Sequence, residues 1–434
     1  MKYVVAFLLA TINFCGAFAQ VGFDAKARAK ECIYLFRQEK FETLYQRMDK
    51  DMQRLLDVEK LEGFWYSLEM QMGAVKEVGE PHVTDRDSLI ITVTPIQFEK
   101  NKFGFKLVFD QVGKISGMYL EPATQKYTPA SYVDASLFYE IKKTLPDPKY
   151  PVEGMLTIPN RGKPFPVVII AAGSGPSDKD LTMGPNRIYK DLAWGLANHG
   201  VATFRFDKRT KTYGTQMSKL KNLTVKEEYL EDLKLAIQVV KKNPEIDSTR
   251  IYILGHSEGG YLIPYFEKNL KGLAGYISFA GSYSDLAPLL LDQLYYLQTL
   301  APAGEKKDYD ELIQQTIYCR DKLTKDSPAD SLPLGMEAAY ILHLNQNSPS
   351  KLAVGLNQKK LLFLQGERDY QVPKSELFLW QNALKNNPNA SFELYPKLNH
   401  LGLEGDKASV PSEYEVAGNI PEYVIKRIAR FVLY

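Results

Sequence analysis

The sequence has little of what several classes of protein require. It holds three cysteines in 434 residues, too few for a disulfide-stabilised scaffold. It also has only five histidines. It contains no His-Glu-x-x-His motif, no paired Cys-x-x-Cys motifs and no phosphate-binding GK[ST] motif, so we expect neither a metal nor a cofactor. The net charge of only +2 favours no nucleic-acid partner. No apolar run reaches the ~20 residues that span a bilayer. With 45% apolar residues, the chain should instead form a globular protein with a large core.

The N-terminus differs from the rest of the chain. Lys2 supplies a positive charge, Val4–Ile12 is apolar, and Ala17-Phe18-Ala19 fits a small-residue cleavage site. We therefore predict a signal peptide over residues 1–19 and a mature chain that begins at Gln20. The mature protein is expected in the periplasm or outside the cell.

Hydrophobic periodicity divides the mature chain into two predicted domains. Over residues 20–122 a helical period gives way to strict alternation, which predicts a small α+β domain. Residues 123–134, polar and containing proline, are predicted to be a linker. Over residues 135–434 β-branched runs alternate with helical segments, which is typical of an α/β fold with a doubly wound, mostly parallel sheet. Within it, residues of about 284–356 lack strand signals and predict a helical insertion over the carboxyl edge of the sheet.

The sharpest motif is Gly255-His256-Ser257-Glu258-Gly259-Gly260. It follows the strand-like Ile251–Leu254 and precedes an apolar helix. A Gly-x-Ser-x-Gly sequence between a strand and a helix is the nucleophile elbow of the α/β-hydrolase fold. Its serine takes a strained backbone, and side chains in place of the flanking glycines would clash with the strand and the helix. Ser257 is the predicted nucleophile.

A serine nucleophile needs a base, and the base needs an orienting acid. In this fold the acid follows a late strand. Lys360–Leu364 is such a strand, and the loop after it carries Asp369. Asp369 is the predicted acid, and Glu367 on the same loop is the alternative.

The base follows by elimination from the histidines. His82 lies in the predicted α+β domain, His199 ends a helix, His256 belongs to the elbow and His343 lies in the insertion. His400 remains, and it follows the strand Ser391–Tyr395 after the acid, in the chain order Ser, Asp, His.

Acyl transfer also needs hydrogen-bond donors for the developing oxyanion. The backbone N–H of Glu258, directly after the nucleophile, is one. The loop after the strand Val167–Ile170 should supply the other, and we predict the N–H of Ser174. The glycines of this loop do not form a nucleotide cradle, because Pro176 lacks the amide that a phosphate would need.

A short basic run follows the strand that ends at Phe206. It contains Lys208, Arg209 and Lys211. A solvated or ion-paired loop is the simpler interpretation. A contact with an acidic group of the substrate is the alternative.

Together these motifs resemble a known family. They are the loop of residues 172–180, Phe206-Asp207-Lys208-Arg209-Thr210, the elbow, and the loops of Asp369 and His400. In this order they resemble bacterial serine carboxylesterases of the EstD type, within the α/β-hydrolase superfamily. The resemblance implies Ser257 as nucleophile, His400 as base, Asp369 as acid, and a short-chain acyl ester as the small-molecule substrate. The segment Gly113–Leu120 resembles part of the small α+β domain of unknown function that often precedes such hydrolases.

Two other functions fit parts of this pattern. A serine peptidase or amidase of the prolyl-oligopeptidase type shares the order Ser, Asp, His, but such enzymes usually carry a large β-propeller in front. A non-catalytic binding protein on a hydrolase scaffold would be expected to have lost Ser257, Asp369 or His400. Cys32 and Cys319 lie far apart in the sequence, and two free or buried thiols are a simpler interpretation than a disulfide between them.

Overall fold

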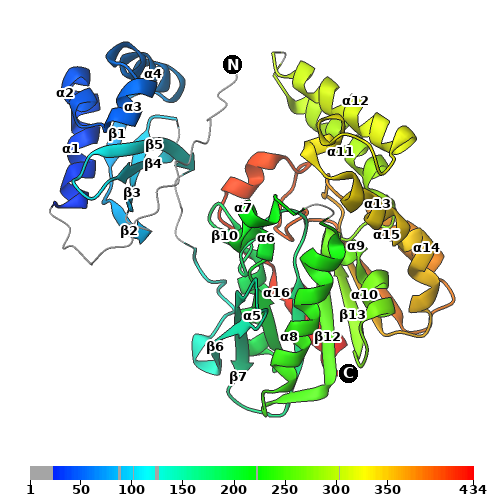
Figure 1. Cartoon of the computed structure of the whole chain (residues 1–434). Helices are drawn as coiled ribbons and strands as arrows, with labels where there is room; N and C mark the ends of the chain where they lie inside the picture. Colours follow the sequence, from blue (N-terminus) through cyan, green and yellow to red (C-terminus); the bar gives the residue numbers. More distant parts are fainter. Residues whose placement is uncertain (1–22, 87–88, 101, 123–126, 221–222, 303) are drawn as a thin grey trace. The chain divides into compact units, whose positions relative to one another are not determined.

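The structure, a computed structural model, describes residues 23–86, 89–100, 102–122, 127–220, 223–302 and 304–434 (Figure 1). The predicted signal peptide lies outside these residues. The chain divides into two compact units, an N-terminal unit up to Lys126 and a C-terminal unit from Tyr127.

In the N-terminal unit, helices come first and strands follow. The helices are α1 (Ala25–Arg37), α2 (Phe41–Gln46), α3 (Lys50–Leu55) and α4 (Val58–Met72). The strands are β1 (Val75–Val78), β2 (His82–Arg86), β3 (Leu89–Phe98), β4 (Lys102–Phe109) and β5 (Ile115–Pro122). β3, β4 and β5 form an antiparallel meander, and β1 and β2 both pair with β3. This is an α+β unit, as predicted.

Short-range signals in the sequence place the N-terminal helices. Asp24 and Asp57 are the N-cap residues directly before α1 and α4. Their side chains accept hydrogen bonds from backbone N–H groups of the first turn. The apolar stripes of the helices then pack on one face of the sheet. At the centre of this core the Trp65 ring stacks on Phe36 at 5.0 Å between ring centroids, and Phe105 meets Phe36 edge-on.

An eight-stranded sheet forms the C-terminal unit. Its strands are β6 (Phe138–Leu145), β7 (Val152–Pro159), β8 (Phe165–Ala171), β11 (Ala202–Phe206), β12 (Ile246–His256), β13 (Gly275–Phe279), β14 (Leu361–Gly366) and β15 (Ala390–Tyr395). They lie in the order β15-β14-β13-β12-β8-β11-β7-β6. All pairings from β15 to β11 are parallel, whereas β7 runs antiparallel to both of its neighbours. The predicted mostly parallel sheet is confirmed.

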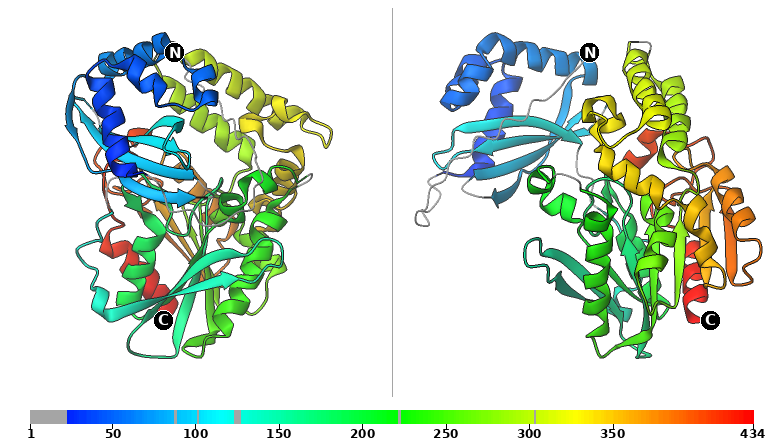
Figure 2. Two further views of the ribbon diagram at one scale, coloured as in Figure 1. Left: turned by 60° about the vertical axis from the view of Figure 1, so that its left-hand side comes forward. Right: turned by 45° about the vertical axis from the view of Figure 1, so that its right-hand side comes forward.

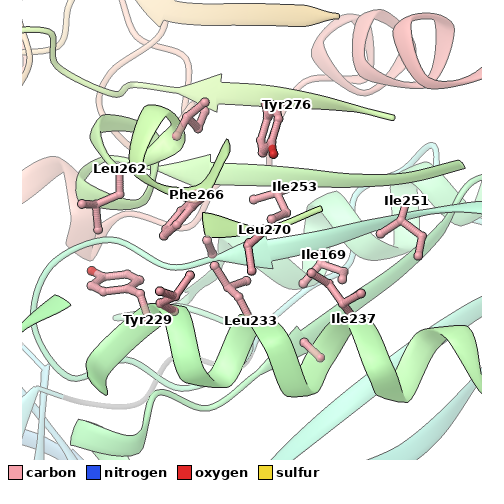
Figure 3. Close-up of a cluster of buried hydrophobic side chains, with 14 of the residues drawn as sticks. Ile169, Tyr229, Leu233, Ile237, Ile251, Ile253, Leu262, Phe266, Leu270 and Tyr276 are labelled. Atoms are coloured by element: carbon pink, nitrogen blue, oxygen red, sulfur yellow. The ribbon is translucent and has the colours of Figure 1, made fainter. Parts of the chain in front are cut away.

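Helices cover both faces of this sheet (Figures 1 and 2). One face carries α5 (Ile188–Asn198) and α16 (Glu422–Leu433), and the other carries the π-helical turn η2 (Lys226–Leu230), α8 (Glu231–Lys241), α10 (Ile263–Asn269) and α15 (Lys374–Ala383). The central strand β8 contributes to both layers. Val167 and Ile169 pack in the core beneath α8, while Val168 and Ile170 pack in the core beneath α5. Figure 3 shows Leu233 and Ile237 of α8 facing Ile169 and Ile253.

Between β13 and β14 the chain leaves the sheet and forms helices. These are α11 (Leu286–Leu300), α12 (Lys306–Lys322), η3 (Ala329–Ser331), η4 (Pro333–Gly335), α13 (Ala338–Gln346), α14 (Pro349–Leu352) and η5 (Ala353–Leu356). We call residues 284–356 the insertion. In Figures 1 and 2 it lies at the end of the sheet where α9 (Glu258–Tyr261) begins. The buried Glu376 of α15 anchors its start by accepting hydrogen bonds from the N–H groups of Tyr283 (2.8 Å) and Ser284 (2.7 Å).

Part of the predicted linker differs from the expectation. Residues 127–134 pack against the C-terminal unit, because two aromatic side chains anchor them. Tyr127 donates a hydrogen bond to Asp191 (2.7 Å), and Tyr132 donates one to the carbonyl of Ile420 (2.6 Å). Residues 123–126 of that linker lie outside the described residues.

Neither cysteine of the described residues is paired. Cys32 and Cys319 are both buried free thiols. Among the described segments, no helix combines the length and the apolarity that crossing a membrane requires.

Candidate active site

Ser257 occupies a sharp turn between β12 and α9. Its backbone has φ 54° and ψ −118°, which is a strained conformation for a residue with a side chain. The turn needs glycine on both sides. A Cβ on Gly255 would lie 2.1 Å from the carbonyl oxygen of Gly259, and one on Gly259 would lie 2.4 Å from that of Ala171. The strained serine and the close approach of its glycines correspond to the nucleophile elbow expected from the sequence.

The structure brings Asp369 and His400 together. Asp369 Oδ2 lies 2.8 Å from His400 Nδ1, and each residue is only 4% exposed. Because an ionised carboxylate only accepts hydrogen bonds, His400 Nδ1 carries the proton and Nε2 is left as the acceptor of the neutral ring. This is the tautomer that a general base requires.

Further hydrogen bonds fix the Asp369 carboxylate. Its Oδ1 accepts from the backbone N–H groups of Gln371 (2.8 Å) and Val372 (2.9 Å), and its Oδ2 accepts from the side-chain amide of Gln365 (3.0 Å). The alternative acid, Glu367, is instead ion-paired with Lys374 on an exposed part of the loop. Asp369, not Glu367, therefore contacts the histidine.

His256 links the elbow to the histidine loop and to the loop of residues 172–180. Its Nε2 lies 3.0 Å from the carbonyl oxygen of His400, and its Nδ1 lies 3.1 Å from the hydroxyl of Tyr189, which accepts from the N–H of Gly173 (3.0 Å). Burial, together with the nearby His400, lowers the pKa of His256 to about 3, so the ring stays neutral. A neutral ring with a proton on Nε2 can donate to His400 and accept from Tyr189, so all of these groups are satisfied.

Both predicted oxyanion donors border one cavity with Ser257. Ser174 follows β8, and Glu258 is the first residue of α9, where backbone N–H groups have no partner within the helix. The loop that carries Asp369 reaches the same cavity through Gln371 and Val372.

The cavity has a volume of about 150 Å³. Its remaining wall is mainly apolar and comes largely from the insertion. The residues are Tyr261, Ser282, Leu286, Leu289, Leu290, Gln293, Leu334, Met336 and Leu344. An apolar wall with a few polar groups at one end suits a small organic ligand.

A buried polar cluster lies beside the elbow, and sequence analysis missed it. It contains Lys208, Glu228, Tyr229, Glu258 and Tyr340. Lys208 forms an ion pair with Glu228 (2.7 Å), and Tyr340 of the insertion donates to Glu228 (2.7 Å). The Tyr229 hydroxyl oxygen lies 2.7 Å from the carboxyl group of Glu258. Burial is the main cause of a raised pKa for the Glu258 carboxyl group, and the negative charge of Glu228 adds to it.

The basic run after β11 is thus an ion-paired loop rather than a solvated one. Arg209 also pairs with a buried carboxylate, Asp232, whereas Lys211 is exposed. No signal near Lys208 could have shown this arrangement, because Glu228 lies on a separate helical turn.

Two other histidines of the C-terminal unit have different partners. His199 faces Glu422 at the end of α5, and the His343 ring packs against Tyr265. Within the described ranges no group of three His, Cys, Asp or Glu side chains is placed to hold a metal ion.

The sheet is mostly parallel and has helices on both faces. A strained serine follows a central strand, and an acid and a histidine follow later strands. These features define the α/β-hydrolase fold. Comparison with known proteins then identifies the group. The chain is 31% identical to Esterase EstD of Thermotoga maritima over 427 residues, which cover 97% of this chain and 98% of that protein. The chain therefore belongs to the EstD esterase family. This places it among the hydrolases that act on esters.

Other comparisons concern parts of the chain. Residues 29–118 match the family model DUF3887, described as a protein of unknown function. Est1E from Butyrivibrio proteoclasticus is 16% identical with a TM-score of 0.42, over 67% of this chain and 97% of that one. The acylaminoacyl peptidase of Pyrococcus horikoshii is 15% identical with a TM-score of 0.46, over 84% of this chain and 56% of that one.

Proposed function

We propose that the protein is an exported serine esterase that cleaves short-chain carboxylic esters through an acyl-enzyme. The observation that carries the proposal is the buried Asp369–His400 pair beside an elbow that presents Ser257 to an apolar cavity. The relation to Esterase EstD supports the choice of an ester bond.

Each predicted residue has a defined role in this reaction. His400 Nε2 takes the proton of the Ser257 hydroxyl as its oxygen attacks the acyl carbon. Asp369 keeps the ring in the required tautomer and stabilises the imidazolium that forms. The N–H groups of Ser174 and Glu258 receive the negative oxygen of the tetrahedral intermediate. His400 then protonates the leaving alcohol. Water next attacks the acyl-enzyme while His400 takes its proton, and His400 returns that proton to the Ser257 oxygen as the acid is released.

The cavity suggests the size of the acyl group. An apolar cavity of about 150 Å³ accommodates a benzene-sized molecule, so we expect acyl chains of up to about six carbons to fit without rearrangement. Longer chains would have to displace side chains of the insertion.

The proposal that the protein is exported rests only on the signal peptide predicted over residues 1–19.

The experiment compares p-nitrophenyl acetate, butyrate and octanoate with a peptide anilide, using the mature protein from Gln20. The proposal predicts ester turnover with a preference for acetate or butyrate and little cleavage of the anilide. Faster cleavage of the anilide than of the esters would identify a peptidase, and turnover of neither class would indicate a binding protein.

A further inference from the structure

The peptide bond between Gly173 and Ser174 is held from its carbonyl side. The Gly173 carbonyl oxygen accepts hydrogen bonds from Lys208 Nζ (2.9 Å) and from the Tyr229 hydroxyl (2.8 Å). The carbonyl and N–H of a trans peptide lie in one plane and point in opposite directions. Fixing the oxygen of Gly173 therefore fixes the direction of the Ser174 N–H, and Ser174 borders the cavity with Ser257.

All three hydrogen-bond donors of Lys208 are used within this arrangement. An ammonium group has three N–H donors, and Lys208 has one acceptor for each: Glu228 Oε1 at 2.7 Å, the Gly173 carbonyl at 2.9 Å and the Tyr229 oxygen at 2.9 Å. The side chain is only 3% exposed, and its nitrogen lies 4.2 Å from the centre of the Tyr229 ring. No donor of Lys208 is left for an acidic group of a substrate.

Tyr229 connects the two predicted oxyanion donors. Its hydroxyl contacts the carbonyl that precedes the Ser174 N–H, and it also lies 2.7 Å from the carboxylate of Glu258, whose own N–H is the other donor. Neither Lys208 nor Tyr229 borders the cavity. Their effect on a bound ester must therefore pass through the peptide they hold.

The positive charge adds an electronic effect to the geometric one. A hydrogen bond from an ammonium group to a peptide oxygen draws electron density away from the amide nitrogen, so the N–H of the same peptide becomes a stronger donor. Such an N–H stabilises an oxyanion more than it stabilises the neutral carbonyl of the substrate.

We propose that Lys208 and Tyr229 are positioning residues of the oxyanion hole, which hold the Gly173–Ser174 peptide so that the Ser174 N–H meets the developing oxyanion. This inference rests on the proposed serine esterase function. It assigns a role in the reaction to two residues that do not border the cavity.

The test uses Lys208→Met and Tyr229→Phe, with Lys211→Met as the matched control from the same basic run. For p-nitrophenyl butyrate we expect Lys208→Met to lower kcat by about 10- to 100-fold, with KM changed less than about twofold. Tyr229→Phe should lower kcat less, because Lys208 still holds the carbonyl. Lys211→Met should leave both constants unchanged, since its side chain is exposed.

A second measurement separates this role from a loss of stability. n-Butylboronic acid forms a tetrahedral adduct with a reactive serine, and one of its oxygens takes the place of the oxyanion. Its inhibition constant should rise by the same factor by which kcat/KM falls. Because Lys208→Met leaves Glu228 buried without its cation, the double variant Lys208→Met/Glu228→Gln removes both charges together. It should show the same loss of kcat.

Folded variants with the kcat and the boronic acid affinity of the wild type would overturn the positioning role. A rise in KM at unchanged kcat would also overturn it, because it would indicate a contact made equally in the ground state. A wild-type protein that neither hydrolyses esters nor reacts with a fluorophosphonate would contradict the proposed function itself, and with it this inference.

Discussion

The side chains of Asp369 and His400 meet at 2.8 Å although 31 residues separate them in the sequence. They do so because each follows one of two neighbouring parallel strands, β14 and β15. The carboxyl ends of parallel strands lie at the same edge of a sheet, so short loops after each can meet. The pairing of acid and base is thus a consequence of the strand order.

Replacement of the acid tests this pairing. Asp369→Asn keeps the shape of the side chain but allows His400 to adopt the other tautomer. We expect kcat for p-nitrophenyl butyrate to fall by about 10³- to 10⁴-fold. Glu367→Gln is the control and should stay within about threefold of the wild type, because Glu367 pairs with Lys374. Equal losses in the two variants would show that the acid is assigned wrongly.

The elbow glycines offer a test of local packing. A methyl group on Gly255 would lie 2.1 Å from a backbone oxygen, so Gly255→Ala requires the turn to move. We expect it to lower the free energy of unfolding by more than about 3 kcal/mol, or to abolish soluble expression. Gly214→Ala is the control, because the position is helical and nothing lies within 4 Å of the added carbon. Urea unfolding measures both, and equal stability of the two variants would contradict the close packing at the elbow.

Sequence reasoning anticipated the observed geometry where the physical cause is local or follows from chain order. The strained turn at Ser257 demands nearby glycines, which a short motif reveals, and the fold fixes the order of the acid and the histidine. It failed where burial decides the role of a charge. Lys208 lies in an ordinary basic run, and only the folded chain places it against Glu228 and the Gly173 carbonyl. The linker was predicted too long for a related reason, because Tyr127 finds its partner, Asp191, only in the folded unit.

His256 should make the protein sensitive to acid. Its pKa is about 3 in the folded protein, below the ordinary 6.5, so between these values the unfolded chain binds a proton that the folded protein does not. Stability is therefore full above pH 6.5 and falls as the pH drops toward 3. From this group we expect a loss of about 2 kcal/mol between pH 7 and pH 5.

Urea unfolding at these two pH values, compared between the wild type and His256→Asn, measures that contribution. The variant should lose clearly less stability on acidification, because asparagine does not titrate. His82→Asn, at an exposed position, should behave like the wild type. If His256→Asn loses as much stability as the wild type, the buried neutral histidine is not the source of acid sensitivity.

The anchor of the insertion can be tested through Glu376. Its buried carboxylate accepts hydrogen bonds from the N–H groups of Tyr283 and Ser284. Glu376→Ala leaves both donors without that partner, and we expect a loss of about 2 to 3 kcal/mol in the free energy of unfolding. Calorimetry should show a lowered Tm, and the KM for butyrate esters should rise because the insertion walls the cavity. An unchanged Tm would mean that other contacts hold the insertion.

The most direct test of the central claim is covalent labelling by a fluorophosphonate, with the modified residue located by mass spectrometry. The account predicts one adduct, on Ser257, formed at a rate that falls sharply in His400→Ala. Ser257→Ala should give no adduct and no ester turnover while keeping the wild-type circular dichroism spectrum. An adduct on another residue, or full ester turnover by folded Ser257→Ala, would contradict the proposal that this elbow serine is the nucleophile.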